Sequence, residues 1–160
     1  MEDEGLTILF LQVAGRAFGV EVHQVEALRR KETVFPASEG PPDLLGFLTL
    51  GGSIVPILDL GICLGAQEST GRQAGMLVVP PVEVTPLAFR VDRVDGPVRL
   101  GWDELALLPA FLRELQPRPI TWAVARQGES LVPVLDLGQL VAPERVAALH
   151  DLAEQLRSPI

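Results

Sequence analysis

Apolar residues occur in short runs along the chain, and turn-forming residues separate these runs. The run at residues 6–13 is followed by Gly15 and a second run at 18–22, and the runs at 44–50 and 53–58 are separated by two glycines. Short runs rich in aliphatic and β-branched residues, joined by a glycine turn, are typical of β-hairpins. The pattern therefore predicts a chain made mainly of short strands.

One pattern occurs twice, 77 residues apart. Residues 53–61 read Ser-Ile-Val-Pro-Ile-Leu-Asp-Leu-Gly, and residues 130–138 read Ser-Leu-Val-Pro-Val-Leu-Asp-Leu-Gly. Seven of the nine positions are identical, and the other two exchange one aliphatic residue for another. A match this dense predicts two copies of one supersecondary unit, each a hairpin whose second strand ends at an aspartate that caps a helical turn.

Two segments have helical spacing instead. Between residues 22 and 30 an apolar residue recurs at every third position, which predicts a short helix. Near the C-terminus, Pro143 is well placed at the first position of a helix, and the spacing after it predicts a helix over 143–157. The residues that form its apolar face are Val146, Leu149, Leu152 and Leu156.

Regularly spaced short strands with turn signals between them favour small barrels over a helix-flanked parallel sheet. We therefore interpret the fold class as all-β with a C-terminal helix, and the repeat as a sign of two pseudo-symmetric halves. The chain has the length of a single domain, residues 1–160. Within it we expect a first β-barrel at about 6–80, a second at about 86–141 and the helix at 143–157.

The net charge, the N-terminal residues and the single cysteine argue against nucleic-acid binding, secretion and membrane insertion. The net charge is −8 and the longest basic cluster is only residues 29–31, so the chain lacks the basic surface that nucleic-acid binding needs. The acidic start, residues 1–4, is unlike a signal peptide, and no apolar run approaches the ~18 residues that cross a bilayer. Cys63 alone permits no internal disulfide. We expect a cytoplasmic protein that neither binds nucleic acid nor inserts into a membrane.

The two Asp-Leu-Gly copies allow one catalytic interpretation. Aspartic proteases place an apolar-Asp-Thr/Ser-Gly motif on each of two symmetric lobes, where two carboxylates share one proton. Asp59 and Asp136 would be that pair, but Leu60 and Leu137 stand where the orienting hydroxyl should be. We therefore interpret Asp59 and Asp136 as caps of helical turns and keep an aspartic-protease-like enzyme as a remote alternative.

No other residue pattern indicates a catalytic, metal or cofactor site. His23, His150 and Cys63 are isolated in the sequence, whereas a metal site needs several such ligands together. The sequence contains no hydrolase nucleophile elbow and no Walker or dinucleotide glycine pattern. We expect no metal ligand, no cofactor and no enzymatic activity.

Residues 44–60 resemble the signature of the CheW-like family, whose members carry a Gly, an apolar strand, an Arg-Gly turn and a Val-Pro-aliphatic-Asp-Leu strand. The resemblance extends over about residues 6–141. It implies a pair of five-stranded, SH3-like β-barrels with pseudo-twofold symmetry, no catalytic activity and no cofactor. The other segments that follow in the family's order are 18–28, 35–36, 91–94, 108–109 and 131–137.

The function that the resemblance implies is that of an adaptor. Members of the family bind the regulatory domain of a chemotaxis-type histidine kinase, itself CheW-like, and the cytoplasmic tips of chemoreceptors. On this basis we expect a protein that is monomeric on its own and is recruited to membrane-bound receptor arrays. The partner-binding residues implied by motif position are Val25, Glu26, Gly46, Leu50, Gly51, Gly52, Ser53, Val91, Asp92 and Val94.

One position departs from the family pattern. Gly51 stands where the family usually has the arginine of the hairpin turn, which lies near the surface used for coupling to receptor and kinase. The chain therefore lacks a charged group with five hydrogen-bond donors at this site. This difference supports an alternative, in which the chain is a divergent paralogue that serves another two-component pathway, such as surface motility or gene regulation, without standard receptor coupling.

Overall fold

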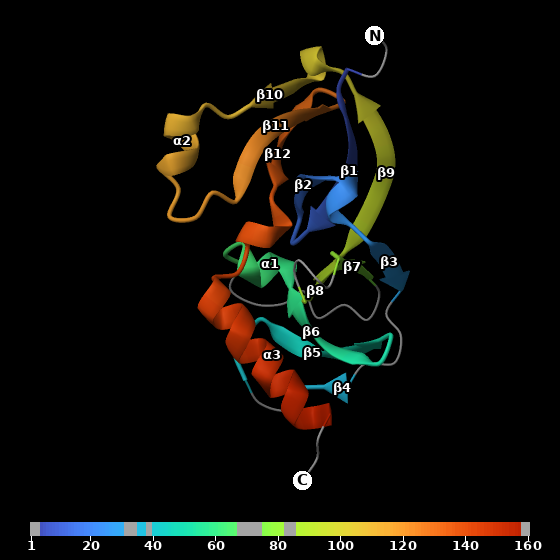
Figure 1. Cartoon of the computed structure of the whole chain (residues 1–160). Helices are drawn as coiled ribbons and strands as arrows, with labels where there is room; N and C mark the ends of the chain where they lie inside the picture. The colour runs from blue at the N-terminus through green and yellow to red at the C-terminus, as the bar shows by residue number, and fades with distance from the viewer. Residues whose placement is uncertain (1–3, 31–34, 38–39, 67–74, 82–85, 158–160) are drawn as a thin grey trace.

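Two β-sheets and a C-terminal helix make up the computed structural model, which describes residues 4–30, 35–37, 40–66, 75–81 and 86–157. Figure 1 shows one sheet in the upper half of the molecule and the other, with the long helix beside it, in the lower half. The upper sheet, here called the N-terminal sheet, has the order β10 (Leu105–Leu107), β11 (Thr121–Gln127), β12 (Ser130–Leu135), β2 (Arg16–Glu21), β1 (Leu6–Val13) and β9 (Arg93–Leu100). The lower sheet, here called the central sheet, has the order β3 (Ala27–Arg30), β7 (Met76–Val79), β8 (Ala88–Val91), β6 (Ser53–Asp59), β5 (Leu44–Leu50) and β4 (Phe35–Pro36).

The helical segments are short except for the last. They are η1 (Val22–Gln24), α1 (Leu60–Cys63), η2 (Trp102–Glu104), α2 (Ala110–Glu114), η3 (Leu137–Gln139) and α3 (Pro143–Arg157). The fold class expected from the sequence, all-β with a C-terminal helix, is confirmed. Each sheet has six hydrogen-bonded strands among the described residues, rather than the five expected.

The two sheets do not follow the expected division of the chain at residues 80–86. β1 and β2 belong to the same sheet as β9–β12, and β8 belongs to the central sheet. The reason is a long-range parallel pairing, because β12 pairs with β2 and β6 pairs with β8. Each hairpin of the repeat thus takes its parallel neighbour from a distant part of the chain, which the apolar pattern alone does not reveal.

The two repeated hairpins have the same strand register. In β5–β6, Phe47 lies opposite Pro56, and in β11–β12, Val124 lies opposite Pro133. Each hairpin also has one register shift at the start of its first strand, between residues 44 and 46 and between residues 121 and 123. The 77-residue offset of the sequence repeat therefore holds for every paired position of the two hairpins.

The structure shows a second repeat, offset by 69 residues, which the sequence pattern alone does not reveal. The β1–β2 and β7–β8 pairs have equivalent registers, and each is followed by Val-x-x-Val and an acidic residue, at 22–26 and at 91–95. The equivalent cross-strand pairs are Leu9–Val20 and Val78–Phe89. Both sheets are therefore built from the same two units, one hairpin of each kind.

The helix expected over residues 22–30 is wrong. Only η1 (Val22–Gln24) is helical, and Ala27–Arg30 form strand β3, which pairs with β7. The N–H of Glu26 donates to the carbonyl oxygen of Val79 at 2.7 Å and so begins this pairing. Tertiary strand pairing outweighs the weak local preference for a helix in so short a segment.

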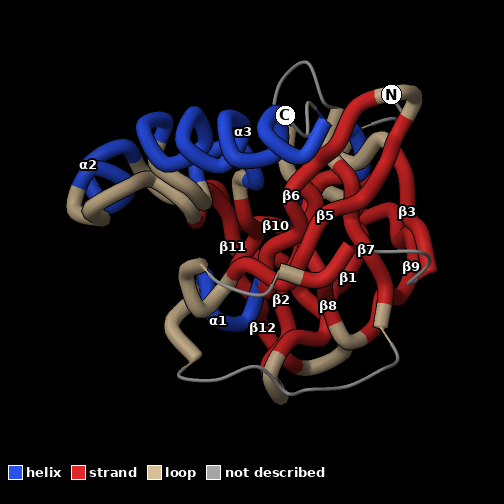
Figure 2. Tube along the Cα trace, turned by 90° about the horizontal axis from the view of Figure 1, so that it is seen from below, coloured by secondary structure: helices blue, strands red, loops and turns tan. Residues whose placement is uncertain are grey.

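Three clusters of buried apolar residues lie in and between the sheets. Two small clusters are equivalent by the repeats, with Val132 and Val134 in the N-terminal sheet matching Val55 and Ile57 in the central sheet. The third and largest cluster takes residues from both sheets and from α3. It joins the two halves, so that they share one core. Figure 2 shows α2 and α3 along one side of the strands.

Helix α3 covers the central sheet and is held there by apolar and ionic contacts. It packs against β6, and its Leu149 and Ala153 are buried in the largest cluster. The guanidinium of Arg145 donates two hydrogen bonds to the buried carboxylate of Asp43. Burial acts to raise the pKa of Asp43, but the hydrogen bonds and positive charge of Arg145 outweigh it and hold that pKa below its usual value. Cys63 donates its thiol hydrogen to Asp43 at 3.6 Å.

Candidate partner-binding surfaces

Asp59 and Asp136 cap separate helical turns, as the sequence predicts. The Asp59 carboxylate accepts a hydrogen bond from the Ile62 N–H at 3.2 Å, and the Asp136 carboxylate accepts one from the Gly138 N–H at 3.0 Å. Asp136 also accepts from the side chain of Gln24 at 3.2 Å, whereas one oxygen of the buried Asp59 has no partner. Since each carboxylate serves its own sheet and no contact joins them in the described chain, they do not form the proton-sharing pair of an aspartic protease.

The described residues contain no group of three or more His, Cys, Asp and Glu side chains that could hold a metal ion. Burial, with Asp43 nearby, raises the pKa of the Cys63 thiol to about 12, so this thiol stays protonated near neutral pH. Among the same residues, no helix is long and apolar enough to cross a membrane.

The β5–β6 turn presents the site at which the family arginine is missing. Gly51 and Gly52 both have positive φ, 51° and 84°, and both are exposed, as is Ser53. A Cβ atom at position 51 would meet no atom within 4 Å, so a longer side chain there would extend into solvent. Leu50 is half-buried and Gly46 is buried, so the accessible part of this expected contact is the turn itself.

A second group of expected contact residues lies where the two sheets meet. Val25 and Glu26 precede β3, and Val94 lies in β9; β3 and β9 are edge strands of different sheets and run near each other in both views (Figures 1 and 2). Val25 and Val94 are half-buried, and Glu26 is exposed. Leu28 and Val98 on the same two strands are each 40% exposed. We call these five residues the edge-strand seam.

Val91 and Asp92, also expected to contact a partner, have structural roles. Val91 is fully buried in the shared core, so its side chain offers no surface to a partner. Asp92 accepts a hydrogen bond from the Ala14 N–H at 3.0 Å and another from Arg90 at 3.1 Å. Because Ala14 has a positive φ of 51°, Asp92 helps to hold the β1–β2 turn beside the point where the chain passes from β8 to β9.

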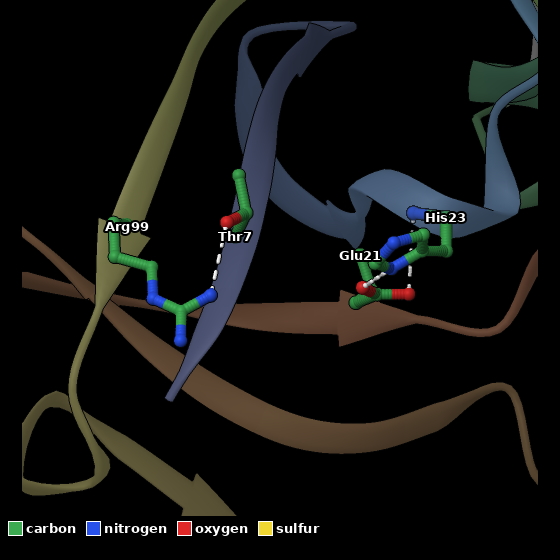
Figure 3. A network of polar contacts seen from close by, with 4 residues as sticks. All are labelled: Thr7, Glu21, His23 and Arg99. Carbon is green, nitrogen blue, oxygen red and sulfur yellow. Dashed lines mark hydrogen bonds and ion pairs between the residues drawn. The ribbon is translucent and has the colours of Figure 1, made fainter. Parts of the chain in front are cut away.

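Polar contacts border the edge-strand seam. The guanidinium of Arg99 in β9 donates to the Thr7 hydroxyl in β1 at 3.4 Å (Figure 3). Nearer to β3, the side chain of Glu21 caps η1 by accepting from the His23 N–H. Its Oε2 lies 2.6 Å from the ring nitrogen Nδ1 of His23. Exposed apolar side chains with polar side chains around them are the usual composition of a protein interface.

The structure also shows a surface that the sequence analysis missed. From the end of β10 through α2 (Ala110–Glu114), residues 107–115 leave four large apolar side chains exposed, including Phe111 at 65% and Leu115 at 76%. We call this the β10–α2 patch; its residues are Leu107, Phe111, Leu112 and Leu115. The side chain of Gln116 holds the following loop by bonding the N–H and the carbonyl of Thr121 at 3.0 and 2.8 Å. Apolar residues at 107, 108, 111, 112 and 115, a helical spacing, were the available signal.

Contiguous exposed apolar side chains of this size are uncommon on a monomer and mark sites of protein association. The β10–α2 patch is also next to a free strand edge, because β10 is the last strand of its sheet among the described residues. The structure therefore presents three candidate surfaces: the β5–β6 turn, the edge-strand seam and the β10–α2 patch.

Comparison with known proteins gives the family of the chain. The family profile described as "CheW-like domain" matches residues 7–145. The chemotaxis protein CheW of Klebsiella aerogenes is 22% identical over 96% of this chain and 92% of its own, and that of Rhizobium meliloti is 24% identical over 72% and 68%. The solved structure of a scaffolding protein, TtCheW from Thermoanaerobacter tengcongensis, matches with a TM-score of 0.68 and 14% identity over 82% of this chain and 89% of that one.

This structural match confirms the fold with two SH3-like β-barrel subdomains that the resemblance implied. The subdomains correspond to the N-terminal and central sheets, with the strand membership given above. The low identities show that the chain has diverged from these relatives. With the profile matching most of its length, the chain belongs to the CheW-like domain family.

Proposed function

We propose that this protein is a non-enzymatic adaptor of chemotaxis-type signalling, which binds the CheW-like regulatory domain of a histidine kinase and the cytoplasmic tips of chemoreceptors. The observation that carries the proposal is the β10–α2 patch, because a group of large exposed apolar side chains marks a site of protein association. The names of the relatives, chemotaxis protein CheW and scaffolding protein, support the pathway.

The kinase domain is the proposed partner of the β10–α2 patch. A CheW-like domain would supply barrel surfaces of the same kind as this chain, and apolar packing between two barrels needs no charged group. Phe111 and Leu115 would be the anchors, because large apolar side chains in the centre of an interface contribute most of the binding free energy.

The receptor tip is the proposed partner of the edge-strand seam and the β5–β6 turn. Leu28 and Val98 offer apolar contact, and Glu26 and the charged residues around them offer the polar rim. Gly51 offers no side-chain donor, so we propose that receptor coupling is weaker than in relatives that keep the arginine. A chain with kinase binding and weak receptor binding would be cytoplasmic and recruited to arrays mainly through the kinase.

The second candidate, a paralogue that serves another two-component pathway without standard receptor coupling, rests on the same glycine. The two candidates differ in which proteins accompany the adaptor in the cell. Tagged parent protein and a Phe111→Glu variant would be purified from the native host, and the bound proteins identified by mass spectrometry. We expect a histidine kinase with the parent and its loss with Phe111→Glu; chemoreceptors with the kinase support the first candidate.

Recovery of a kinase without chemoreceptors would support the second candidate. Recovery of no kinase, or equal recovery with Phe111→Glu, would contradict the proposed surface. Leu156→Glu serves as the control, because Leu156 is also exposed but lies on α3, outside all three surfaces.

A further inference from the structure

The two repeated hairpins differ in whether a helix covers their outer faces. On β5–β6 that face carries Phe47, Ile54 and Pro56, since Phe47 lies opposite Pro56 and side chains alternate along each strand. The opposite face, with Leu48, Val55 and Ile57, belongs to the small cluster inside the central sheet.

Helix α3 covers this outer face of the central sheet. It packs against β6, and its buried residues Leu149 and Ala153 belong to the same apolar cluster as Phe47. Ile54 packs against this cluster as well. Under this cover Phe47 and Pro56 are buried.

The equivalent face of β11–β12 has no such cover in the described residues. By the 77-residue offset, Val124, Leu131 and Pro133 match Phe47, Ile54 and Pro56. Val124 and Pro133 are only half-buried, and Leu131 is 69% exposed. The chain thus repeats the apolar face but uses its single long helix on one copy, even though α3 directly follows the N-terminal sheet in sequence.

We propose that the outer face of β11–β12, defined by Val124, Leu131 and Pro133, binds an amphipathic helix of a partner protein. The central sheet shows that a face of this register and composition accommodates a helix with apolar residues three and four positions apart. The exposed Arg126 lies directly opposite Leu131, where the central sheet has Thr49. An acidic residue on the edge of the bound helix would pair with Arg126 and set its direction.

A second copy of this chain is a poorer occupant. Its own α3 is already buried against its own central sheet, and withdrawing that helix would expose Phe47 and separate Arg145 from Asp43. The inference rests on the equivalence of the two hairpins and does not depend on the proposed function.

The test uses the full chain and a peptide with the sequence of residues 143–157, the helix that covers the equivalent face. An isolated helix of this length is marginal in water, so the peptide carries Ala147→Lys bridged by a lactam to Asp151, two positions exposed in α3. The peptide is titrated into the labelled chain, and binding is followed by the shifts of backbone amide resonances. We expect saturable binding with the largest shifts in β11 and β12, and at least about tenfold weaker binding to Leu131→Glu.

The matched control is Leu156→Glu, the same substitution at an exposed leucine on α3, outside the proposed face and outside the three surfaces described above, which should bind as the parent does. No binding up to about 1 mM peptide would overturn the proposal, because even a weak helix site saturates in that range. Unchanged binding to Leu131→Glu would also overturn it and would place the peptide elsewhere. Concentration-dependent dimerisation of the parent that Leu131→Glu abolishes would show that a second copy is the occupant.

Discussion

The β5–β6 and β11–β12 hairpins have a nearly identical second strand and the same register, but they lie in different surroundings. Both end in a capping aspartate, and both turn through a glycine with positive φ, 51° at Gly51 and 64° at Gly128. The central hairpin is covered by α3 and its aspartate is buried, whereas the N-terminal hairpin is open and its aspartate is half-exposed.

The comparison separates what the shared residues of the two hairpins determine from what the differing residues determine. The shared residues specify strands, register and caps, because these depend on alternation and local hydrogen bonds. The residues that differ between the copies, and the position of α3, which follows β12 but packs on the central hairpin, decide which outer face remains open. Under the proposed function, the partner surfaces would therefore lie where the two halves differ.

The largest difference between the two hairpins should appear when equivalent outer-face residues are truncated. Phe47→Ala removes a buried ring beneath α3 and should lower the free energy of unfolding by about 3–5 kcal/mol. Val124→Ala, at the equivalent position of the open copy, removes a smaller and only half-buried side chain and should lower it by less than about 1 kcal/mol. Urea unfolding of both variants and the parent measures the difference; equal losses would mean that the open face is covered in solution.

Loss of the ion pair that holds α3 should have the next largest effect. Asp43→Asn leaves the Arg145 guanidinium without its carboxylate and should cost about 2 kcal/mol, less than for a fully buried pair because Arg145 is partly exposed. The Asp43 pKa is lower in the folded chain, so its stabilising contribution is present above the unfolded pKa of about 4 and is lost as the pH falls below that value.

Urea unfolding between pH 3 and pH 7, with hydrogen exchange of the α3 amides, tests this prediction. The parent should lose more stability than Asp43→Asn as the pH falls through about 4, and α3 should exchange faster in the variant at pH 7. Asp151→Asn, on the exposed side of α3, is the control. A variant with the same pH dependence as the parent would mean that the ion pair does not form in solution.

Equivalent substitutions in the two hairpin turns separate backbone strain from partner binding. Gly51→Arg and Gly128→Arg each place a side chain at positive φ with open space around it, so each should cost about 1 kcal/mol of stability. Only Gly51→Arg should strengthen binding to a receptor-tip fragment, by roughly tenfold to over a hundredfold, because charge-assisted hydrogen bonds contribute about 1.5–3 kcal/mol.

Thermal melts and titration calorimetry with the receptor-tip fragment and the kinase domain measure these effects. Kinase binding should stay within a few-fold of the parent in both variants. Tight receptor binding by the parent, unchanged by Gly51→Arg, would indicate that another residue has taken over the role of the family arginine.

The smallest expected effects are those of the two capping aspartates. Asp59→Asn and Asp136→Asn should each change the free energy of unfolding by at most about 1 kcal/mol, because Asn is also a good N-cap. A peptidase assay over acidic pH accompanies the melts. Acid proteolysis by the parent that disappears in the double variant would revive the aspartic-protease alternative.

Local patterns in the sequence were sufficient for the hairpins, the caps and α3, and insufficient for what depends on distant contacts. The match between residues 53–61 and 130–138 predicted both hairpins and both caps. The three-residue spacing predicts a helix where residues 27–30 form a strand, because the pairing of this strand with β7 is made by residues far along the chain.

The candidate sites show the same limit. The family motif includes Val91 among the expected partner-binding residues, but Val91 is buried. It does not include Phe111, which is exposed. Whether an apolar residue is buried or exposed depends on how the sheets and helices pack. The sequence shows only that the residue is apolar.

The most direct test of the account is a titration of the CheW-like regulatory domain of the host's histidine kinase against the parent, Phe111→Glu and Leu28→Glu. If the adaptor binds the kinase through the β10–α2 patch, the parent should bind saturably, Phe111→Glu at least about tenfold more weakly, and Leu28→Glu within a few-fold of the parent. No binding by the folded parent, or binding by Phe111→Glu as tight as the parent's, would contradict it.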